Sequence, residues 1–355
     1  MTDQYLVTGL MSGSSLDGVD LACCRFSYEH LRWQYRILAA ETFPYPTSVR
    51  QQLENAIGWG DDRLMQLDLD MGNYFGEALN RFHRKYGLTP DLIASHGHTI
   101  LHEPSRSITL QVGNGAVMAE KTGIRVVNDF RKADVQQGGQ GAPLVPVGDR
   151  LLFSDYGACM NLGGFANLSY ETDQGVRIAY DIGPCNLVLN WGASLLGKPY
   201  DPEGSIARSG QIKEQLFNTL NGLPYYSIQP PKSLGREWFL TQFLPHLVQA
   251  RGEPGDLLAT AVEHLALQMG AALNQSGAAN VLVTGGGSFN HFLLERLEYH
   301  TGASLMVPDQ LLIAYKEALI FALLGLLRTR GEINCLASVT GGKQDLSAGE
   351  IHTPK

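Results

Sequence analysis

The chain has 355 residues and a formal net charge of −8, from 27 Lys and Arg against 35 Asp and Glu. This acidic balance argues against a dedicated nucleic-acid binder, which needs a basic surface to meet phosphates. Hydrophobic residues make up 44 % of the chain, which excludes disorder for most of it. The length favours two lobes over a single core.

The sequence shows no membrane or export signal. The first ten residues lack the basic start of a signal peptide, and the longest apolar run, residues 318–327, is shorter than a membrane-spanning helix. The cysteines are odd in number and form no CxxC pair, which favours a reducing cytoplasm over disulfides or a zinc site. They are Cys23, Cys24, Cys159, Cys185 and Cys335.

The first half opens with two apolar runs, residues 5–10 and 19–26, around a turn rich in Gly, Ser and Asp, which predicts a β-hairpin. Apolar residues recur at spacings of three and four over residues 61–86, which predicts a helix ending at Gly87. Short strands are predicted at 91–95 and 124–127. The stretch 136–146, rich in Gly, Gln and Pro, is typical of a connection between lobes.

The second half repeats this opening. Strands are predicted at 158–162, 166–170 and 176–180, with a turn at Gly163 and Gly164 and with Pro184 in the first turn of a helix. An apolar helix at 257–274, a strand at 280–284, three glycines and a further helix follow. Because each half opens with a hairpin whose turn is Gly-rich, we expect two similar lobes facing each other across a cleft.

The first hairpin turn is a candidate phosphate loop. Gly13 and Gly18 let backbone N–H groups approach a phosphate, and the hydroxyls of Ser14 and Ser15 can donate further hydrogen bonds. Asp17 is the candidate metal ligand, holding Mg²⁺ through waters. An ordinary tight turn is the alternative.

Two further Gly-rich turns are candidates for the same ligand. The turn at Gly163 and Gly164 repeats the first design without an acid, so two turns can clamp one polyphosphate. Residues 285–287 follow a strand and open a helix, where an adenine or ribose can lie flat on the backbone. A plain strand-to-helix turn is the alternative there, and the GxGxxG spacing of a dinucleotide site is absent.

Two charged residues follow predicted strands closely. Asp181 precedes a Gly-Pro helix start, so it is either a general base toward a hydroxyl or water, or the cap of that helix. Arg131 either holds a substrate carboxylate with two hydrogen bonds or forms a salt bridge with Asp129 or Asp134.

Three histidines, His96, His98 and His102, lie close together in the sequence. Their spacing matches no familiar zinc ligand set, so a polar contact to substrate is favoured over a metal site. A buried, hydrogen-bonded histidine is the alternative.

Nine segments in a fixed order carry a resemblance over nearly the whole chain. They are GLMSGSSLDGVD (9–20), SHGHTI (95–100), NDFRKADV (128–135), GGQGAPLVP (138–146), NLGGFAN (161–167), DIGPCN (181–186), GKPYD (197–201), PPKSLGRE (230–237) and TGGGSFN (284–290). Together they resemble one family, the anhydro-N-acetylmuramic acid kinases of the actin/hexokinase-like superfamily.

The resemblance implies an α/β, two-lobe actin-like ATPase fold with ribonuclease H-like lobes and with ATP and Mg²⁺ in the cleft. We place the lobes at residues 1–140 and 141–355, and the C-terminal segment is a candidate to pack back on the first lobe. The implied enzyme is a phosphotransferase that hydrolyses the 1,6-anhydro bond of anhydro-N-acetylmuramic acid and phosphorylates O6. Its product is N-acetylmuramic acid 6-phosphate, an intermediate of peptidoglycan recycling.

The resemblance also implies roles for single residues. Asp181 takes the position of the catalytic base that activates water, and the sugar side falls to His98, Asp129, Arg131 and Glu317. For Glu317 the alternative is a favourable interaction with a helix dipole, because it stands at the start of the apolar run 318–327. The implied ATP-binding residues are Gly13, Ser14, Ser15, Leu16, Asp17, Gly18, Val19, Asp20, Gly163, Gly164, Gly285, Gly286, Gly287 and Asn290.

Residues 311–317 depart from the family pattern, which leaves a related sugar or polyol kinase of the same fold as an alternative. A non-catalytic actin-like ATP-binding protein is a second alternative, although a nucleotide switch does not need a base such as Asp181. The expected partner is a small sugar in the cytoplasm, with neither nucleic acid nor membrane. A homodimer is one candidate assembly.

Overall fold

The computed structural model describes residues 4–13 and 15–355 and divides into two compact units. Unit 1 comprises Met1–Leu152 and Tyr315–Lys355, and unit 2 comprises Phe153–Ala314. The division therefore falls after Leu152, whereas the sequence suggests residue 140. The C-terminal segment belongs to the same unit as the N-terminal one.

The sheet of unit 1 is an antiparallel meander extended by parallel strands. Its strands are β1 (Gln4–Ser12), β2 (Gly18–Glu29), β3 (Arg32–Pro44), β4 (Leu92–Glu103), β5 (Ile108–Val112), β6 (Val126–Asn128) and β12 (Glu350–His352). The expected hairpin is present, because β1 and β2 pair antiparallel with Val7 opposite Cys24. β4 and then β6 add in parallel on the other side of β1, which gives the order β12-β6-β4-β1-β2-β3, with β5 paired to β4.

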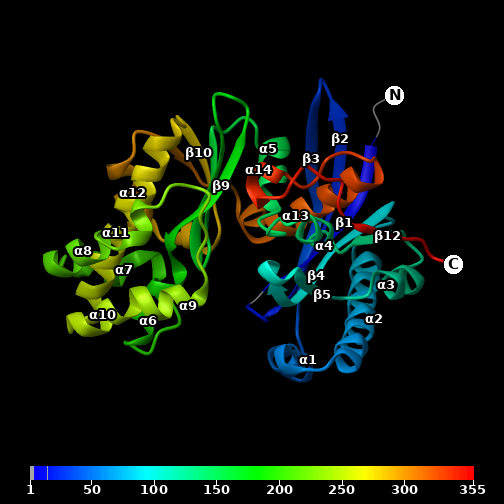
Figure 1. Cartoon of the computed structure of the whole chain (residues 1–355), viewed down its shortest axis with the longest axis horizontal. Helices are drawn as coiled ribbons and strands as arrows, with labels where there is room; N and C mark the ends of the chain where they lie inside the picture. Colours follow the sequence, from blue (N-terminus) through cyan, green and yellow to red (C-terminus); the bar gives the residue numbers. More distant parts are fainter. Residues whose placement is uncertain (1–3, 14) are drawn as a thin grey trace. The chain divides into compact units, whose positions relative to one another are not determined.

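The helices of unit 1 include the long one that the apolar spacing predicts. They are α1 (Thr47–Asn55), α2 (Asp61–Tyr86), α3 (Gly115–Thr122), α4 (Lys132–Gln136), α5 (Val145–Leu152), α13 (Gln310–Thr329), which enters this unit at Tyr315, and α14 (Ala337–Thr340). α2, light blue in Figure 1, ends at Gly87 in the left-handed conformation, as predicted. Its Phe75, Leu79 and Phe82 are fully buried in one core with Val19 and Leu21.

The sheet of unit 2 repeats the plan of the first. Its strands are β7 (Ala158–Leu162), β8 (Phe165–Glu171), β9 (Arg177–Pro184), β10 (Asn280–Thr284) and β11 (Ser304–Met306). β7, β8 and β9 form an antiparallel meander, and β10 and then β11 add in parallel beside β7, in the order β11-β10-β7-β8-β9. The α/β fold class and the repeated architecture are confirmed. Pro184 was expected to open a helix, but it ends β9 because its ladder with β8 runs as far as Phe165.

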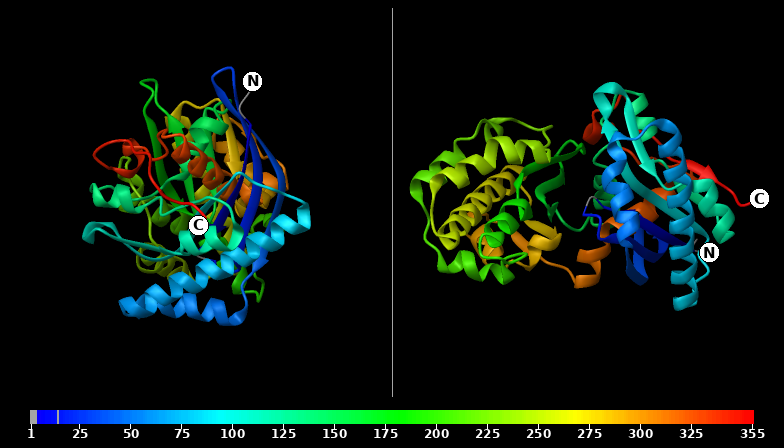
Figure 2. Two further views of the ribbon diagram at one scale, coloured as in Figure 1. Left: turned by 90° about the vertical axis from the view of Figure 1, so that its right-hand side faces the viewer. Right: turned by 90° about the horizontal axis from the view of Figure 1, so that it is seen from below.

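One helix organises the rest of unit 2. The helices are α6 (Asn186–Ser194), α7 (Ser205–Ser209), α8 (Glu214–Asn221), α9 (Arg236–Trp238), α10 (Leu244–Ala250), α11 (Pro254–Ser276) and α12 (His291–His300). α11 contacts α6, α7, α8 and α12 as well as β8 and β9, and Figures 1 and 2 show it among these helices. Its apolar residues, including Val262, Leu265 and Met269, are buried in a core separate from that of unit 1.

α13 is the buried helix of the C-terminal segment. A Cβ on Gly9 of β1 would overlap the carbonyl oxygen of Ala318, and one on Gly325 would overlap the side chain of Ala94, so the helix backbone lies directly on the sheet. By length and composition α13 is apolar enough to cross a membrane, but 67 % of that stretch is buried inside the protein, as in a core helix. Because α13 begins at Gln310, Glu317 lies within the helix and not at its start. The helix-dipole alternative for Glu317 is therefore wrong.

Residues 136–146 do not connect the two units. They lie inside unit 1, where the Asp134 carboxylate accepts hydrogen bonds from the Gly141 N–H (2.8 Å) and from the Thr340 hydroxyl (2.8 Å). Asp134 and Thr340 are 0 and 1 % exposed. The Gly- and Pro-rich stretch is a partly exposed loop whose backbone is tied to the buried Asp134 and, through the hydrogen bond from the Gln140 N–H to the Thr340 carbonyl (2.8 Å), to the C-terminal segment.

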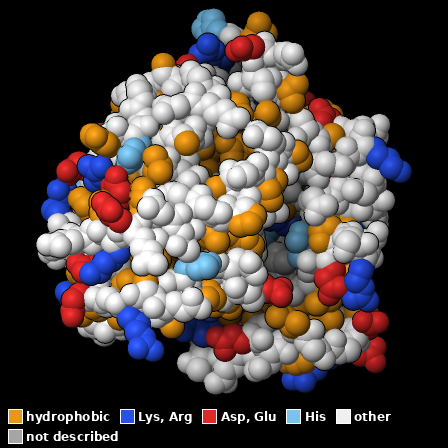
Figure 3. Space-filling view, turned by 60° about the vertical axis from the view of Figure 1, so that its left-hand side comes forward, with side chains coloured by type: hydrophobic (Ala, Val, Ile, Leu, Met, Phe, Trp, Pro, Cys, Tyr) orange, Lys and Arg blue, Asp and Glu red, His pale blue; other side chains and the backbone are white. Residues whose placement is uncertain are grey.

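Charged side chains are dispersed over the face of the molecule drawn in Figure 3. Lys and Arg side chains stand singly or beside Asp and Glu there, without a continuous basic stripe on that face. This distribution agrees with the net charge of −8.

We predict that Gly9→Ala destabilises the protein by about 1–3 kcal/mol, because the added methyl forces α13 away from β1. Chemical denaturation followed by circular dichroism measures this. Gly58→Ala is the matched control, because a Cβ there meets no atom within 4 Å. Equal stabilities of the two variants would contradict the close helix–sheet contact.

Candidate active site

The turn between β1 and β2 carries the expected polar groups. The Ser15 hydroxyl donates to the Asp17 carboxylate (2.7 Å), and both residues are exposed. Gly13 precedes them and Gly18 opens β2, whereas Ser14 lies outside the described residues. Such a turn leaves hydroxyl, carboxylate and backbone groups open to a polar ligand.

Three predicted residues of this segment also make structural contacts. Leu16 adopts a left-handed φ of 57° and its carbonyl accepts from Arg50, while Val19 is fully buried in the core of unit 1. Asp20 accepts a hydrogen bond from Thr42 (2.6 Å), and burial raises the pKa of its carboxyl, with Asp17 adding a smaller effect of the same sign.

The donor set of the turn fits Mg²⁺. Asp17 and Ser15 offer a carboxylate and a hydroxyl, which are hard oxygen ligands, and leave most of an octahedron for water and phosphate. Within residues 4–13 and 15–355, no group of three or more His, Cys, Asp and Glu side chains is arranged to hold a metal. The three histidines of β4 are accordingly not such a site.

His98 belongs to a buried polar group at the end of β1. Its Nδ1 lies 2.8 Å from the Ser12 hydroxyl, which is also hydrogen-bonded to the Tyr45 hydroxyl. Burial lowers the pKa of His98 to about 4, so the ring is neutral at pH 7. Its Nε2 has no hydrogen-bond partner in the described part of the chain and can serve a ligand.

Arg131 has partners that neither sequence interpretation anticipated. Its Nε donates to His96 Nε2 (3.1 Å) and its Nη1 to the Gly141 carbonyl (2.6 Å). The salt bridge to Asp129 or Asp134 is therefore wrong, because Asp129 pairs with Lys132 (3.4 Å) and Asp134 is used by other donors. His96 accepts from the guanidinium, and burial together with the positive charge of Arg131 lowers its pKa well below the usual range.

The charges of Arg131 and Asp20 both act on Glu317. Burial raises the pKa of Glu317, the charge of Arg131 opposes that shift, and the charge of Asp20 adds to it. Tertiary structure thus brings together one residue from β2, one from the segment after β6 and one from α13.

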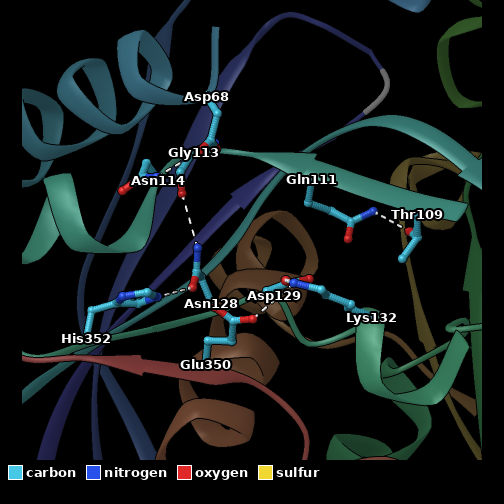
Figure 4. A network of polar contacts seen from close by, with 10 residues as sticks. All are labelled: Asp68, Thr109, Gln111, Gly113, Asn114, Asn128, Asp129, Lys132, Glu350 and His352. Atoms are coloured by element: carbon cyan, nitrogen blue, oxygen red, sulfur yellow. Dashed lines mark hydrogen bonds and ion pairs between the residues drawn. The ribbon is translucent and has the colours of Figure 1, made fainter. Parts of the chain in front are cut away.

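Asp129 lies at the end of β6 in the polar network of Figure 4. Its backbone is left-handed (φ 55°), and Lys132 pairs with both Asp129 and Glu350 of β12. The preceding Asn128 donates to the Gly113 carbonyl (3.3 Å) and is hydrogen-bonded to His352 (2.9 Å). Burial raises the pKa of Asp129, against the opposing charge of Lys132.

The glycine turns of unit 2 converge. The carbonyls of Gly163 and Gly164 accept from the N–H groups of Asn186 (3.0 Å) and Cys185 (2.7 Å) at the start of α6. Gly285 has a φ of 84°, and a Cβ there would lie 2.5 Å from Asn161 Oδ1 and 2.8 Å from the Leu162 carbonyl. Residues 163–164 and 285–287 are therefore neighbours, although they are more than 100 residues apart in sequence.

Asn290, expected beside the nucleoside, caps α12. Its side-chain oxygen accepts from the Leu293 N–H (2.9 Å), and the residue is 7 % exposed. The side-chain oxygen of Asn290 thus has a structural partner, and a nucleotide would be a second one.

Asp181 lies in β9, so its interpretation as a helix cap is wrong. Its Oδ2 accepts a hydrogen bond from the Leu234 N–H (2.8 Å), and its Oδ1 has no hydrogen-bond partner among the residues that the structure describes. Burial raises the pKa of the carboxyl and the Leu234 hydrogen bond opposes that shift. This carboxylate can accept a proton at the oxygen that is left without a partner.

Three residues next to these groups escaped sequence reasoning. Tyr45 contacts Ser12, and no motif points to it. Tyr225 and Leu234 contact Asp181, and although the segment 230–237 contributes to the family resemblance, that resemblance gives it no role. Leu234 acts through its backbone N–H, so its residue type carries no signal.

Comparison with known proteins gives one family. A family model described as anhydro-N-acetylmuramic acid kinase matches residues 4–354. An anhydro-N-acetylmuramic acid kinase of Pseudomonas putida is 38 % identical over 98 % of this chain and 99 % of its own length. One of Pasteurella multocida is 35 % identical over 97 % of this chain and 96 % of its own length.

Solved structures similar to this chain are more distant in sequence. Component A of the (R)-2-hydroxyglutaryl-CoA dehydratase of Acidaminococcus fermentans is 11 % identical, with a TM-score of 0.46 over 92 % of this chain and 99 % of that one.

We predict that acid destabilises the protein partly through His98. Its pKa is about 4 in the folded state against an ordinary 6.5, so the unfolded chain takes up a proton that the folded chain refuses as the pH falls from 6.5 to 4. The free energy of unfolding is therefore expected to be about 2 kcal/mol lower at pH 5 than at pH 7 through His98 alone.

Denaturation at pH 7 and pH 5 tests this prediction. His98→Gln should show a smaller loss of stability on acidification than the unmodified protein, whereas His291→Gln, at an exposed position, should keep the full loss. Identical losses in all three proteins would refute a neutral, buried His98.

Proposed function

The chain belongs to the anhydro-N-acetylmuramic acid kinase family, and we propose that it opens the 1,6-anhydro bond of anhydro-N-acetylmuramic acid while it transfers a phosphoryl group from ATP to O6. Water adds to C1, the C1–O6 bond breaks, and O6 takes the γ-phosphoryl group. The products are N-acetylmuramic acid 6-phosphate and ADP. The observation that carries the proposal is the Asp181 carboxylate, which is held by one oxygen and has a raised pKa.

Asp181 is the proposed general base. A carboxylate whose pKa is raised by burial takes a proton from water more readily than an ordinary one. The Leu234 N–H keeps Oδ2 occupied, so Oδ1 receives the proton while the water oxygen attacks C1. Loss of the proton as the new bond forms avoids a positively charged oxygen at C1.

The glycine turns are the proposed binding groups for ATP. Phosphoryl transfer depends mainly on positioning and on neutralising phosphate charge, for which backbone N–H groups and hydroxyls suffice without a covalent intermediate. Asp17 with Ser15 would hold Mg²⁺, which neutralises charge on the phosphate oxygens when bound. Gly163, Gly164 and residues 285–287 support the same proposal by their convergence in unit 2.

The sugar side is assigned to His98, Asp129, Arg131 and Glu317. His98 offers a ring nitrogen that is not used by the fold. Glu317 has an exposed side chain whose carboxyl pKa is raised by partial removal from water, which favours hydrogen bonds with hydroxyl or amide groups. Arg131 supports this site by fixing His96. We place the reaction in the cytoplasm, in agreement with five free, buried cysteines, and assign it to peptidoglycan recycling.

Asp181→Asn should lower kcat by about 10²–10⁴-fold, because the amide cannot take the proton. With ATP, Mg²⁺ and the anhydro sugar in ¹⁸O-water, the unmodified protein should give a 6-phosphate that carries ¹⁸O at C1. Mass spectrometry must read the label promptly, before the hemiacetal oxygen exchanges.

The exposed Asp173→Asn serves as control and should keep full activity. Phosphorylation of a sugar without uptake of ¹⁸O, or turnover of a different sugar or polyol in preference to the anhydro sugar, would overturn the proposed reaction.

Asp17→Asn should raise the Mg²⁺ concentration needed for half-maximal rate about tenfold, because a hard, charged ligand is replaced by a neutral one. Rates measured over a range of Mg²⁺ at saturating sugar give this value. Asp62→Asn, on the exposed start of α2, provides the comparison. An unchanged Mg²⁺ requirement would remove Asp17 from the metal site.

A further inference from the structure

The segment 225–234 enters the proposed reaction only through the Leu234 N–H, which holds one oxygen of Asp181. It runs from Tyr225 to Leu234 and includes most of the PPKSLGRE motif. Its contacts with Asp181, Tyr180 and Trp238 lie within unit 2. It lies beside β9, the edge strand of that sheet.

The segment satisfies the polar groups of Asp181 one by one. The Tyr225 hydroxyl donates to the Asp181 carbonyl (2.6 Å), and the Asp181 N–H donates to the Lys232 carbonyl (3.3 Å). The Leu234 N–H donates to Oδ2 (2.8 Å). An edge strand leaves backbone groups without a ladder partner, and here one segment supplies partners for the N–H, the carbonyl and the carboxylate of Asp181.

The strand itself is irregular at this residue. In the ladder between β8 and β9, Asn167 faces Asp181 but Ala166 faces Gly183, so Ile182 is an extra residue. A bulge of this kind re-aims a neighbouring side chain and weakens local pairing. The backbone of Asp181 therefore depends on partners outside the sheet for its orientation.

Lys232 and Tyr225 also contact each other within the segment. The Lys232 ammonium donates to the Tyr225 carbonyl (3.2 Å) and lies 4.6 Å from the ring of Tyr225 and 5.7 Å from that of Tyr180. Tyr225 is 6 % exposed, and its ring packs against Trp238 with centroids 5.2 Å apart. The Tyr225 side chain is thus held in place by buried packing and by the contacts of Lys232.

We propose that the segment 225–234 is the positioning element of the general base, with the Tyr225 hydroxyl as its principal positioning residue. This inference rests on the proposed function of Asp181. The hydroxyl fixes the bulged backbone, the Leu234 N–H holds one carboxylate oxygen, and the other oxygen stays aimed at the water. Tyr225 touches neither substrate nor nucleotide in this role.

Tyr225→Phe tests the proposal, because it removes the hydroxyl and keeps the ring. We expect kcat to fall at least about tenfold with little change in the KM for the sugar, since the lost group acts on the chemical step. The Leu234 hydrogen bond favours the ionised form of the Asp181 carboxylate. Loss of order at Asp181 weakens this hydrogen bond and so raises the pKa of the carboxyl. The acidic limb of the pH–rate profile should therefore move to higher pH.

Tyr226→Phe is the matched control. The neighbouring Tyr226 is partly buried, and its hydroxyl is hydrogen-bonded to His264 Nε2 (2.8 Å) and not to Asp181. It should leave the pH–rate profile in place even if it lowers the melting temperature as much as Tyr225→Phe. Lys232→Met, which removes the brace, should move kcat in the same direction as Tyr225→Phe.

Equal pH–rate profiles for Tyr225→Phe, Tyr226→Phe and the unmodified protein would overturn the positioning role while leaving the proposed function intact. A ¹³C NMR titration of the Asp181 carboxyl, assigned with Asp181→Asn, gives a readout independent of turnover. A titration midpoint that rises in Tyr225→Phe supports the positioning element even if the anhydro sugar is not a substrate. An unchanged midpoint refutes it.

Discussion

The contact of α13 with the sheet of unit 1 is the constraint on which the first half of the site depends. Because Gly9 has no side chain, the helix backbone at Ala318 lies against β1. The adjacent Glu317 is thereby carried into the environment of Arg131 and Asp20. The hydrogen bonds from Thr340 and Gly141 to the buried Asp134 tie the rest of the C-terminal segment to the loop after β6. One close packing contact thus determines where three distant parts of the sequence meet.

The two units use one strand order for different chemistry. In unit 1 the hairpin turn carries acids and hydroxyls, including Asp17 and Ser15. In unit 2 the corresponding turn carries only Gly163 and Gly164, and the acid appears on the third strand, as Asp181. A third strand at the sheet edge has open backbone groups, so a covering segment can hold its residues from outside the sheet. The repeated sheet is the scaffold of both units, and the edge strand β9 of unit 2 is where the proposed base Asp181 can be held by a covering segment.

Burial governs the electrostatics of the candidate site. It raises the pKa of Asp20, Asp129, Asp181 and Glu317, and it lowers that of His96 and His98. Removal of water disfavours every charged form, so the carboxyls become better bases and the histidines stay neutral. A neutral histidine and weakly acidic carboxyls suit the recognition of a sugar, whose hydroxyl and amide groups both donate and accept hydrogen bonds. Asp17 lies on an exposed turn, where its carboxylate can bind a cation.

Local patterns in the sequence determined the hairpins, the helix 61–86 with its Gly87 end, the strand 280–284 and the polar groups of the first turn, because each depends on residues a few positions apart. The position of Asp181 just after an apolar run was also visible, but whether it caps a helix or lies in a strand was decided by the ladder with β8. Tertiary structure alone decided that Glu317 lies within a buried helix, that Arg131 binds His96 and that Tyr225 holds Asp181. These outcomes depend on contacts between residues 35 to more than 300 positions apart, which no periodicity or turn composition encodes.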